Sequence, residues 1–470
     1  MRRQTQKAIA DDFGGANFGD LRLTARLESL AEAVDRRPSD SFPKLAKSDA
    51  ELEGTYRFLN NPRVGPEAIL GPHVRGTVAR AAVEGTVLVV HDTSVFLYSG
   101  EEHRPGLGFI KSGQGFVGHF AMAVTADGLR KPLGLLGFLT IFRDERRRTH
   151  GMTYRERFAD PNKERLKWTR LAEISEGHLD GAAAAIHVMD READSFELIS
   201  RLLETSKRFV IRGTWDRRLE SWTKANRVMA SDELAKVDDV LEREVRLSRR
   251  SSRLQSGTMR RIHPAREGRM ARLRVRATTV RIKRQTGPEF WHLPRGLTVN
   301  LVRVSEVDAP KGEAPVEWLL LTTEPIKTKK QIAAVVDHYR ARWIIEDYFK
   351  ALKTGCAFEK RQLENRLAIQ NALALFAPVA WRLLALRSLA RAEAKAPAST
   401  VLTPLQLKLL RWKSKRVPVA ANPTAYEAML AVAGLGGHLK RNGDPGWQTL
   451  GRGYHDLLLL EAGWAARDEM

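Results

Sequence analysis

Two aspartates follow apolar runs that are typical of buried strands. Asp92 closes VEGTVLVVHD and Asp190 closes AAAAIHVMD. Folds of the α/β type place their sites at the carboxyl ends of strands. Carboxylates projecting from neighbouring strands repel each other unless cations lie between them. Oxygen ligands favour hard divalent ions such as Mg²⁺ or Mn²⁺. An aspartate after a strand is also a common turn or cap residue, and the two runs alone leave that alternative open.

A third acid lies in a stretch with helical periodicity, KTKKQIAAVVDHYRARWIIEDYFKALKTG, whose C-cap is expected at Gly355. At about 100° per residue, a group of polar side chains falls on one face within roughly 80°: Tyr339, Arg342, Glu346, Lys350 and Lys353. The opposite side is apolar enough to pack, so we expect the polar face to line a groove. A carboxylate among cations suits phosphodiester chemistry. A solvated Arg–Glu–Lys ladder is the alternative.

The charge of the chain points to a polyanionic partner. The 470 residues include 78 Lys and Arg against 56 Asp and Glu, a formal net charge of +22. Such an excess would repel itself without a polyanion, so nucleic acid is the first candidate and an anionic membrane surface the second. No run approaches the roughly 20 apolar residues of a membrane span, and the first residues lack the apolar core of a secretory signal. Cys356 is the only cysteine, which excludes an internal disulfide. We therefore expect no membrane association and a reducing cytoplasm.

Basic residues are concentrated in one stretch. Residues 246–284 contain 14 Lys and Arg and a single acid, Glu267. Within this stretch RLRVRATTVRIK alternates basic and apolar side chains, which predicts a strand with one basic face. We expect a surface for the DNA backbone here, and a solvated loop beside a charge-protected edge strand is the alternative.

The order of the remaining patterns predicts a mixed α/β fold with helical ends. The first 75 residues and the last 95 have helical spacing, whereas the middle alternates valine-rich strands with helices. We expect three regions: a helical N-terminal DNA-binding domain over 1–75, a catalytic α/β domain over 76–375 with a β-strand insertion at about 214–312, and a helical domain over 376–470.

Several of these segments resemble one known family. The helix spells Y-x2-R-x3-E-x6-K at Tyr339, Arg342, Glu346 and Lys353, which is similar to the YREK signature of bacterial transposases of the insertion-sequence-four family. DREAD at 190–194 resembles the second acidic motif of the transposon Tn-five branch, and HDTS at 91–94 resembles the first. FGDLRLTARL and GTYRFLNNPRVGPEAI resemble the N-terminal DNA-binding domain of that branch, and NGDPGWQTLGRGYHDL resembles the end of its dimerisation domain.

The resemblance implies a fold and a reaction. The fold would be an RNase H-like core with a β-strand insertion. The protein would bind the inverted-repeat ends of its own mobile element on double-stranded DNA, cut there as an endonuclease through a hairpin, and join the 3′ ends to target DNA. Two Mg²⁺ ions per active site, replaceable by Mn²⁺, would be held by Asp92, Asp190 and Glu346. Pairing two ends implies a homodimer in a synaptic complex in the bacterial cytoplasm, at the nucleoid.

The resemblance also implies DNA contacts at single positions. Trp318, 21 residues before Tyr339, matches a tryptophan that stacks on a flipped base, and Arg212 matches an arginine near that nucleotide. Each has a structural alternative, namely a core tryptophan and an ion-pair partner. Phosphate contacts are implied for Tyr339, Arg342 and Lys353 and extended to Lys350. In the N-terminal motif, Arg22 and Arg26 are four residues apart and are expected to share a DNA-facing side.

Two other functions stay open on these residues. One is another RNase H-like nuclease, such as a junction resolvase, although it would not need the YREK helix or the stacking tryptophan. The other is a catalytically silent DNA-binding relative, such as a transposition inhibitor, against which the intact acidic triad argues.

Overall fold

The computed structural model describes residues 12–98, 104–110, 113–143, 156, 160, 163–220, 228–247, 265–400, 402–415, 417–439 and 444–468. The chain forms two compact units. Unit 1 comprises Met1–Gly151, Arg170–Ala184 and Trp343–Met470, and unit 2 comprises Met152–Thr169 and Ala185–Arg342. Much of the basic stretch, residues 248–264, lies outside the described residues.

Unit 1 is built on an antiparallel sheet. Its strand β3 (Gly113–Thr125) pairs along its length with β1 (Thr86–Tyr98), while β2 (Gly108–Ile110) and β4 (Pro132–Ile141) pair with successive parts of β3. Almost every side chain of β3 is buried, as its near-continuous apolar sequence predicts. The strand containing Asp92 was expected to end at that residue, but β1 continues to Tyr98. The residues that follow are mainly β-branched or aromatic, and these favour a strand.

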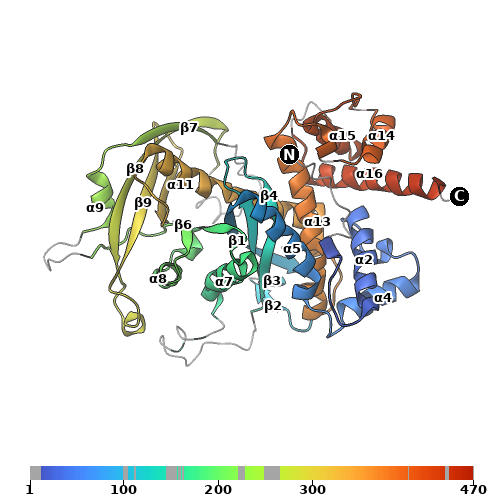
Figure 1. The fold of residues 1–470 in the computed structure, drawn as a ribbon, viewed down its shortest axis with the longest axis horizontal. Coiled ribbons are helices and arrows are strands. Elements are labelled where there is room, and N and C mark those ends of the chain that lie inside the picture. Colours follow the sequence, from blue (N-terminus) through green and yellow to red (C-terminus); the bar gives the residue numbers. More distant parts are fainter. Residues whose placement is uncertain are drawn as a thin grey trace. The chain divides into compact units, whose positions relative to one another are not determined.

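Two long helices cover this sheet. The helices α5 (Pro66–Glu84) and α13 (Arg366–Ala392) both pack on β4 and on each other, as Figure 1 shows. The window Arg366–Ser388 of α13 has a mean hydropathy of 1.4, which corrects the expectation that no segment is long and apolar enough to cross a membrane. However, 83% of this window is buried inside the protein, so its apolarity is that of a core helix.

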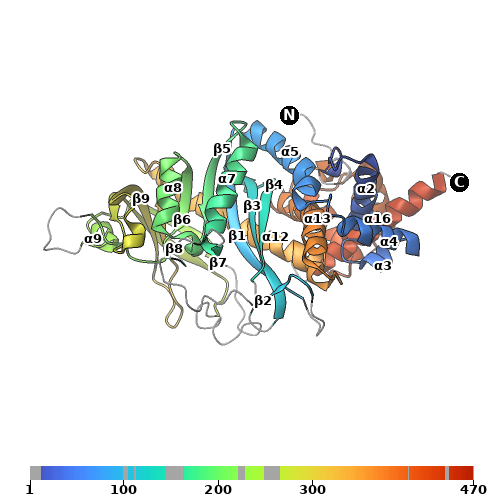
Figure 2. The same cartoon turned by 90° about the horizontal axis from the view of Figure 1, so that it is seen from below.

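Unit 2 holds a mixed sheet. Its strands follow the order β5, β6, β10, β9, β8, β7, in which β5 and β6 are parallel and the other pairs antiparallel. Their bounds are Ala184–Met189, Arg208–Arg212, Glu317–Thr322, Gly296–Val307, Arg269–Lys283 and Leu241–Leu247, in that order. The helix α8 (Phe196–Glu204) packs on β6 (Figure 2), and α11 (Lys329–Ala341) packs on β6, β7 and β9. The expected mixed α/β class is confirmed, and β7, β8 and β9 lie inside the predicted insertion at 214–312.

The segment expected as one long helix is broken into three. Its first part, α11, ends at Ala341, α12 spans Trp343–Lys350, and Ala351–Gly355 forms a π-helical turn. The single-face geometry of Tyr339 to Lys353 assumed one unbroken helix, and a 100° step does not carry across a break and a wider turn. The apolar side was predicted correctly, since Ile345, Tyr348 and Leu352 are buried.

The N-terminal and C-terminal helical regions extend beyond the domain limits that the sequence predicted. The boundary expected at 75/76 lies inside α5, and the one at 375/376 lies inside α13. Both boundaries are corrected, because a continuous helix is not a linker between domains. The remaining helices are α2 (Leu21–Arg36), α3 (Phe42–Leu45) and α4 (Asp49–Leu59), α7 (Lys167–Leu179) and α9 (Ala230–Ala235), and α14 (Pro404–Lys413), α15 (Ala425–Leu435) and α16 (Trp447–Asp468).

Candidate active site

Asp92 lies in the middle of β1, opposite Phe120 of β3. Its side chain is half-buried, and its Oδ1 accepts a hydrogen bond from the backbone N–H of Thr93 (2.8 Å). The adjacent Thr93 hydroxyl is 3.0 Å from Nδ1 of His119, which is fully buried. His119 lies on β3 directly opposite Thr93 and belongs to the buried part of the sheet.

Asp190 directly follows β5, as predicted. It is the N-cap of a short 3₁₀ turn, Arg191–Ala193, and its Oδ1 accepts from the N–H of Glu192 (2.9 Å). The last acid of the motif, Asp194, has a buried side chain that accepts from the N–H of Thr214 (2.6 Å) and pairs with Arg217. Asp194 thus fixes the loop after β6, and Asp190 remains the half-buried carboxylate at the strand end.

Glu346 lies on α12, half-buried, in unit 1. The same unit holds Lys353, whose ammonium donates to the carbonyl oxygen of Val95 in β1 and lies 3.4 Å from Glu359. The Lys353 ammonium also lies 4.7 Å from the centre of the Phe96 ring. Lys353 is therefore fixed against the second half of β1, whereas Lys350 is exposed and pairs with Asp347 (3.0 Å).

Tyr339, Trp318 and Arg212 form one group in unit 2. The Tyr339 ring is fully buried and packs edge-on against Trp318, with 5.5 Å between ring centres. Arg212 donates to the Tyr339 hydroxyl (3.5 Å) and to the carbonyl oxygen of Glu317 (3.1 Å). Trp318 is only 8% exposed and Arg342 only 6%. The structure therefore joins three of the predicted DNA-contacting residues, but it buries the tyrosine and the tryptophan.

A cavity of about 310 Å³ opens beside this group in unit 2. Its wall includes Arg191, Arg212, Trp215, Ser231, Arg303 and Glu317. Burial and the neighbouring charge of Arg212 lower the pKa of Arg191, as expected of a cation near another cation. Trp215 is 69% exposed. The sequence analysis did not identify it as a candidate binding residue. The signal was its position among arginines in RGTWDRR, just after Arg212.

The donor chemistry of the three acids fits a hard divalent cation, because carboxylate oxygens are the ligands that Mg²⁺ prefers. Asp92 and Glu346 belong to unit 1 and Asp190 to unit 2. Over the part of the chain that the structure describes, no three His, Cys, Asp or Glu side chains are gathered as a metal-binding group. The structure thus supplies the position of each acid on its own element.

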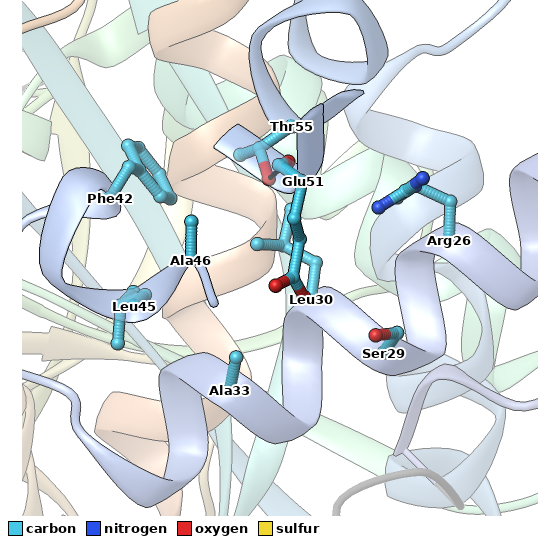
Figure 3. Close-up of a pocket in the computed structure, with 9 residues that line it drawn as sticks. All are labelled: Arg26, Ser29, Leu30, Ala33, Phe42, Leu45, Ala46, Glu51 and Thr55. Carbon is cyan, nitrogen blue, oxygen red and sulfur yellow. Dashed lines mark hydrogen bonds between the residues drawn. The ribbon is translucent and has the colours of Figure 1, made fainter. Parts of the chain in front are cut away.

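The two N-terminal arginines differ in their surroundings. Arg22, in the first turn of α2, is 90% exposed and pairs with Asp20, the N-cap of that helix (2.9 Å). Arg26 is half-buried and lines a small hollow between α2, α3 and α4 that also includes Glu51 (Figure 3). Of the two, Arg22 is the one that is open to a partner.

The basic face of β8 is largely neutralised within unit 2. Arg269 pairs with Glu306 and Glu313, Arg272 with Asp308 (2.6 Å), and Arg274 with Glu242 (2.9 Å). Arg276 pairs with Asp239 (2.7 Å) and Arg281 with Glu220. The charge count along the sequence therefore overstated this strand as a DNA surface, since the acids come from neighbouring segments.

Two family models match the chain. Residues 5–64 match a transposase DNA-binding family, and residues 174–379 match a transposase DDE domain family. The first match includes Arg22 and Arg26. The second includes Asp190, Glu346, Arg212, Trp318, Tyr339, Arg342, Lys350 and Lys353, but it does not reach Asp92. These two matches, together with the mixed α/β architecture, support the chain as a DDE transposase, an enzyme that acts on DNA.

Proposed function

We propose that the protein binds the inverted-repeat ends of its own mobile element, cuts the DNA there, and joins the freed 3′ ends to a target. The observation that carries this proposal is the placement of Asp190 and Glu346. Both lie inside the matched DDE domain, one directly after a buried strand and the other half-buried on a helix. The insertion-sequence-four family and its Tn-five-like YREK branch are part of the proposal, on the spacing of Tyr339, Arg342, Glu346 and Lys353.

In this proposal Asp92, Asp190 and Glu346 would hold two Mg²⁺ ions, or Mn²⁺ in their place. Bound divalent ions would activate a water or a 3′-hydroxyl for attack on phosphorus and stabilise the leaving oxygen. The task of the chain's own residues is to place the three carboxylates and to exclude competing ligands. Asp92 depends most on the motif, because it lies outside the matched DDE domain.

The phosphate contacts are proposed for cations near the acids. Lys353 lies beside β1 through Val95 and Glu359. Arg342 joins α11 to α12, and exposed Lys350 lies one turn after Glu346. A cation at such positions offsets the charge of a phosphodiester. The buried Tyr339 would act through Arg212, whose guanidinium it holds by its hydroxyl.

A flipped nucleotide would enter the cavity lined by Arg191 and Arg212. The two guanidiniums suit a phosphate, and Trp215 offers the open aromatic face that an extruded base needs. Trp318 is packed against Tyr339, so its proposed stacking role would require its ring to be uncovered. The hairpin step and a homodimer that pairs two ends in a synaptic complex follow from the family resemblance.

The test is strand cleavage on duplex DNA that carries the sequences flanking this gene, with Mg²⁺ present. The wild-type protein should nick and then cut at the element ends. Glu346→Ala should lose at least ~1,000-fold in rate, since it removes an acid that acts in the transition state. The control is Glu84→Ala, which removes an exposed acid at the end of α5. Equal cleavage by wild type and Glu346→Ala would reject the triad. Sequence-specific binding with no cleavage by wild type would favour the silent DNA-binding relative, and cleavage of branched DNA alone would favour a resolvase.

A further inference from the structure

We propose that the exposed face of α14 in the C-terminal region is a separate surface for the backbone of double-stranded DNA. The surface consists of Lys408, Arg411, Trp412, Lys413 and Lys415, and we call it the α14 surface. It lies outside both family matches, which cover residues 5–64 and 174–379, and it contains none of the acids proposed for catalysis.

The charge of this segment is one-sided. Between Glu393 and Glu427 the sequence has six Lys and Arg and no acid. Four of the six belong to the α14 surface, and all four are exposed. A cluster of exposed cations with no acid in the same stretch of sequence attracts a polyanion, and the regular phosphates of a duplex are the closest match in charge density.

The helix presents three of these residues on one side. Lys408, Arg411 and Trp412 have the i, i+3, i+4 spacing that places side chains on one face of a helix. The other side holds Leu407, Leu409 and Leu410, which are buried. The helix packs on α15 and α16 (Figure 1) and is therefore held as a fixed support. Its N-terminus is closed by a capping box between Thr403 and Gln406.

The cations of the α14 surface differ from those of β8 in their partners. The arginines of β8 pair with acids of neighbouring segments, for example Arg272 with Asp308 and Arg276 with Asp239. Among the residues that the structure describes, Lys408, Arg411, Lys413 and Lys415 make no ion pair. Cations near the end of a helix also stabilise its dipole, but that role does not account for charge at both Lys408 and Lys415.

An exposed tryptophan, Trp412, is a second feature of the α14 surface that indicates a ligand. Its side chain is 67% exposed in the middle of the cations, with the Lys413 ammonium 5.5 Å from its ring centre. An indole that is this exposed gains little from apolar burial, so packing does not account for it. Beside a duplex it would cover deoxyribose carbon atoms and donate its ring N–H to a phosphate oxygen. Charge and the aromatic side chain therefore point to the same ligand.

The experiment measures binding of the full chain to a fluorescein-labelled duplex of scrambled sequence in EDTA. Anisotropy titrations between about 50 and 200 mM salt give the slope of log K against log salt, which is about −0.9 per phosphate contacted. We expect the triple variant Lys408→Gln/Arg411→Gln/Lys413→Gln to lower the magnitude of this slope by about 2 to 3. We expect Trp412→Ala to weaken binding by about 5- to 10-fold with little change in slope.

The matched control is Arg272→Gln/Arg274→Gln/Arg276→Gln, which removes the same charge from ion-paired positions of β8. It should leave the slope nearly unchanged. Circular dichroism melting shows whether each variant is folded. A slope that is the same for the α14 triple variant and the wild type would overturn the proposal and leave an acidic protein surface as the partner. This outcome is independent of whether the enzyme cleaves DNA.

Discussion

Two tryptophans near Arg212 have opposite surroundings. Trp318 is buried edge-on against Tyr339, whereas Trp215 lines the cavity and is largely exposed. A buried ring contributes to stability through burial, and an exposed ring is available for a ligand. The structure thus separates a packed ring from an open ring within one group of residues, and the proposed base recognition belongs to the open one.

Replacing each tryptophan by alanine tests this separation. Trp318→Ala should lower the free energy of unfolding of unit 2 by about 3–5 kcal/mol, because it leaves a cavity against Tyr339. Trp215→Ala should change it by no more than about 0.5 kcal/mol, yet weaken binding to a duplex with an unpaired terminal base. Chemical denaturation and anisotropy titration measure the two effects. A stable Trp318→Ala protein with impaired base binding would assign the stacking role to Trp318 instead.

The sequence predicted some of these residues better than others. Asp190 was predicted at the end of a strand and lies there, because the buried strand ends within AAAAIHVMD. Asp92 was also predicted at a strand end, but β1 continues past it through the polar residues of HDTS. Tyr339 was expected on a polar face and is buried instead. A single helical wheel could not show that Arg342 interrupts the helix.

Helix α5 and strand β4 approach each other closely at Gly134. This residue has φ +145°, and a methyl group there would lie 2.0 Å from the Thr77 hydroxyl oxygen of α5. The register of β4 also shifts next to this point. Glycine therefore allows the helix to pack directly on the strand.

Gly134→Ala should lower the free energy of unfolding by about 2–5 kcal/mol, since overpacking adds to backbone strain. The matched control is Gly128→Ala. Gly128 also has positive φ (+86°) but has no atom within 4 Å of the added methyl, so this change should cost about 1–2 kcal/mol. Equal losses for the two variants, measured by urea denaturation, would show that α5 and β4 are not in close contact.

A buried histidine joins α5 to the N-terminal segment. The His73 Nε2 accepts from the N–H of Leu135 (3.0 Å), so its Nδ1–H donates to Asp12 (3.2 Å). Burial lowers the pKa of His73, and the charges of Arg80 and Arg382 lower it further, while Asp12 raises it. The neutral form is therefore the one that the fold accommodates.

Stability should depend on pH through this residue. Below the unfolded pKa of about 6.5, the unfolded chain takes up a proton that folded His73 resists, so stability falls as pH drops from about 7 to 5. His73→Gln should reduce this slope by up to about 1.4 kcal/mol per pH unit. The exposed His292 provides the control variant His292→Gln. Urea denaturation at several pH values gives the slopes, and unchanged slopes for both variants would rule out His73 as their source.

Across the whole chain, composition correctly indicated a nucleic-acid partner but located it poorly. The run of basic residues at 246–284 predicted a DNA surface, yet the arginines of β8 are paired with acids that are distant in sequence. Sheet topology, which brings those acids to β8, cannot be obtained from local charge counts. The smaller cluster on α14 has fewer charges but no ion pairs among its described residues, and only the structure distinguishes the two.

The fold class was predictable because strand and helix periodicities are local. The domain limits were not, since α5 and α13 run through both expected boundaries. The same helices join the N-terminal DNA-binding segment to the sheet that holds Asp92. The proposed triad requires that this aspartate share one metal site with Asp190 and Glu346.

Iron-directed cleavage of the protein backbone tests whether Asp92, Asp190 and Glu346 share one metal site. Fe²⁺ replaces Mg²⁺ at oxygen sites, and with ascorbate and peroxide it produces radicals that cut the nearest peptide bonds. With end-specific DNA bound, we predict cuts beside Asp92, Asp190 and Glu346 that excess Mg²⁺ suppresses. All three cuts should be lost together in Asp190→Asn, because carboxylates that share ions bind them jointly. Cuts that persist at Asp92 and Glu346 in Asp190→Asn, or that fall elsewhere, would contradict a shared acidic triad.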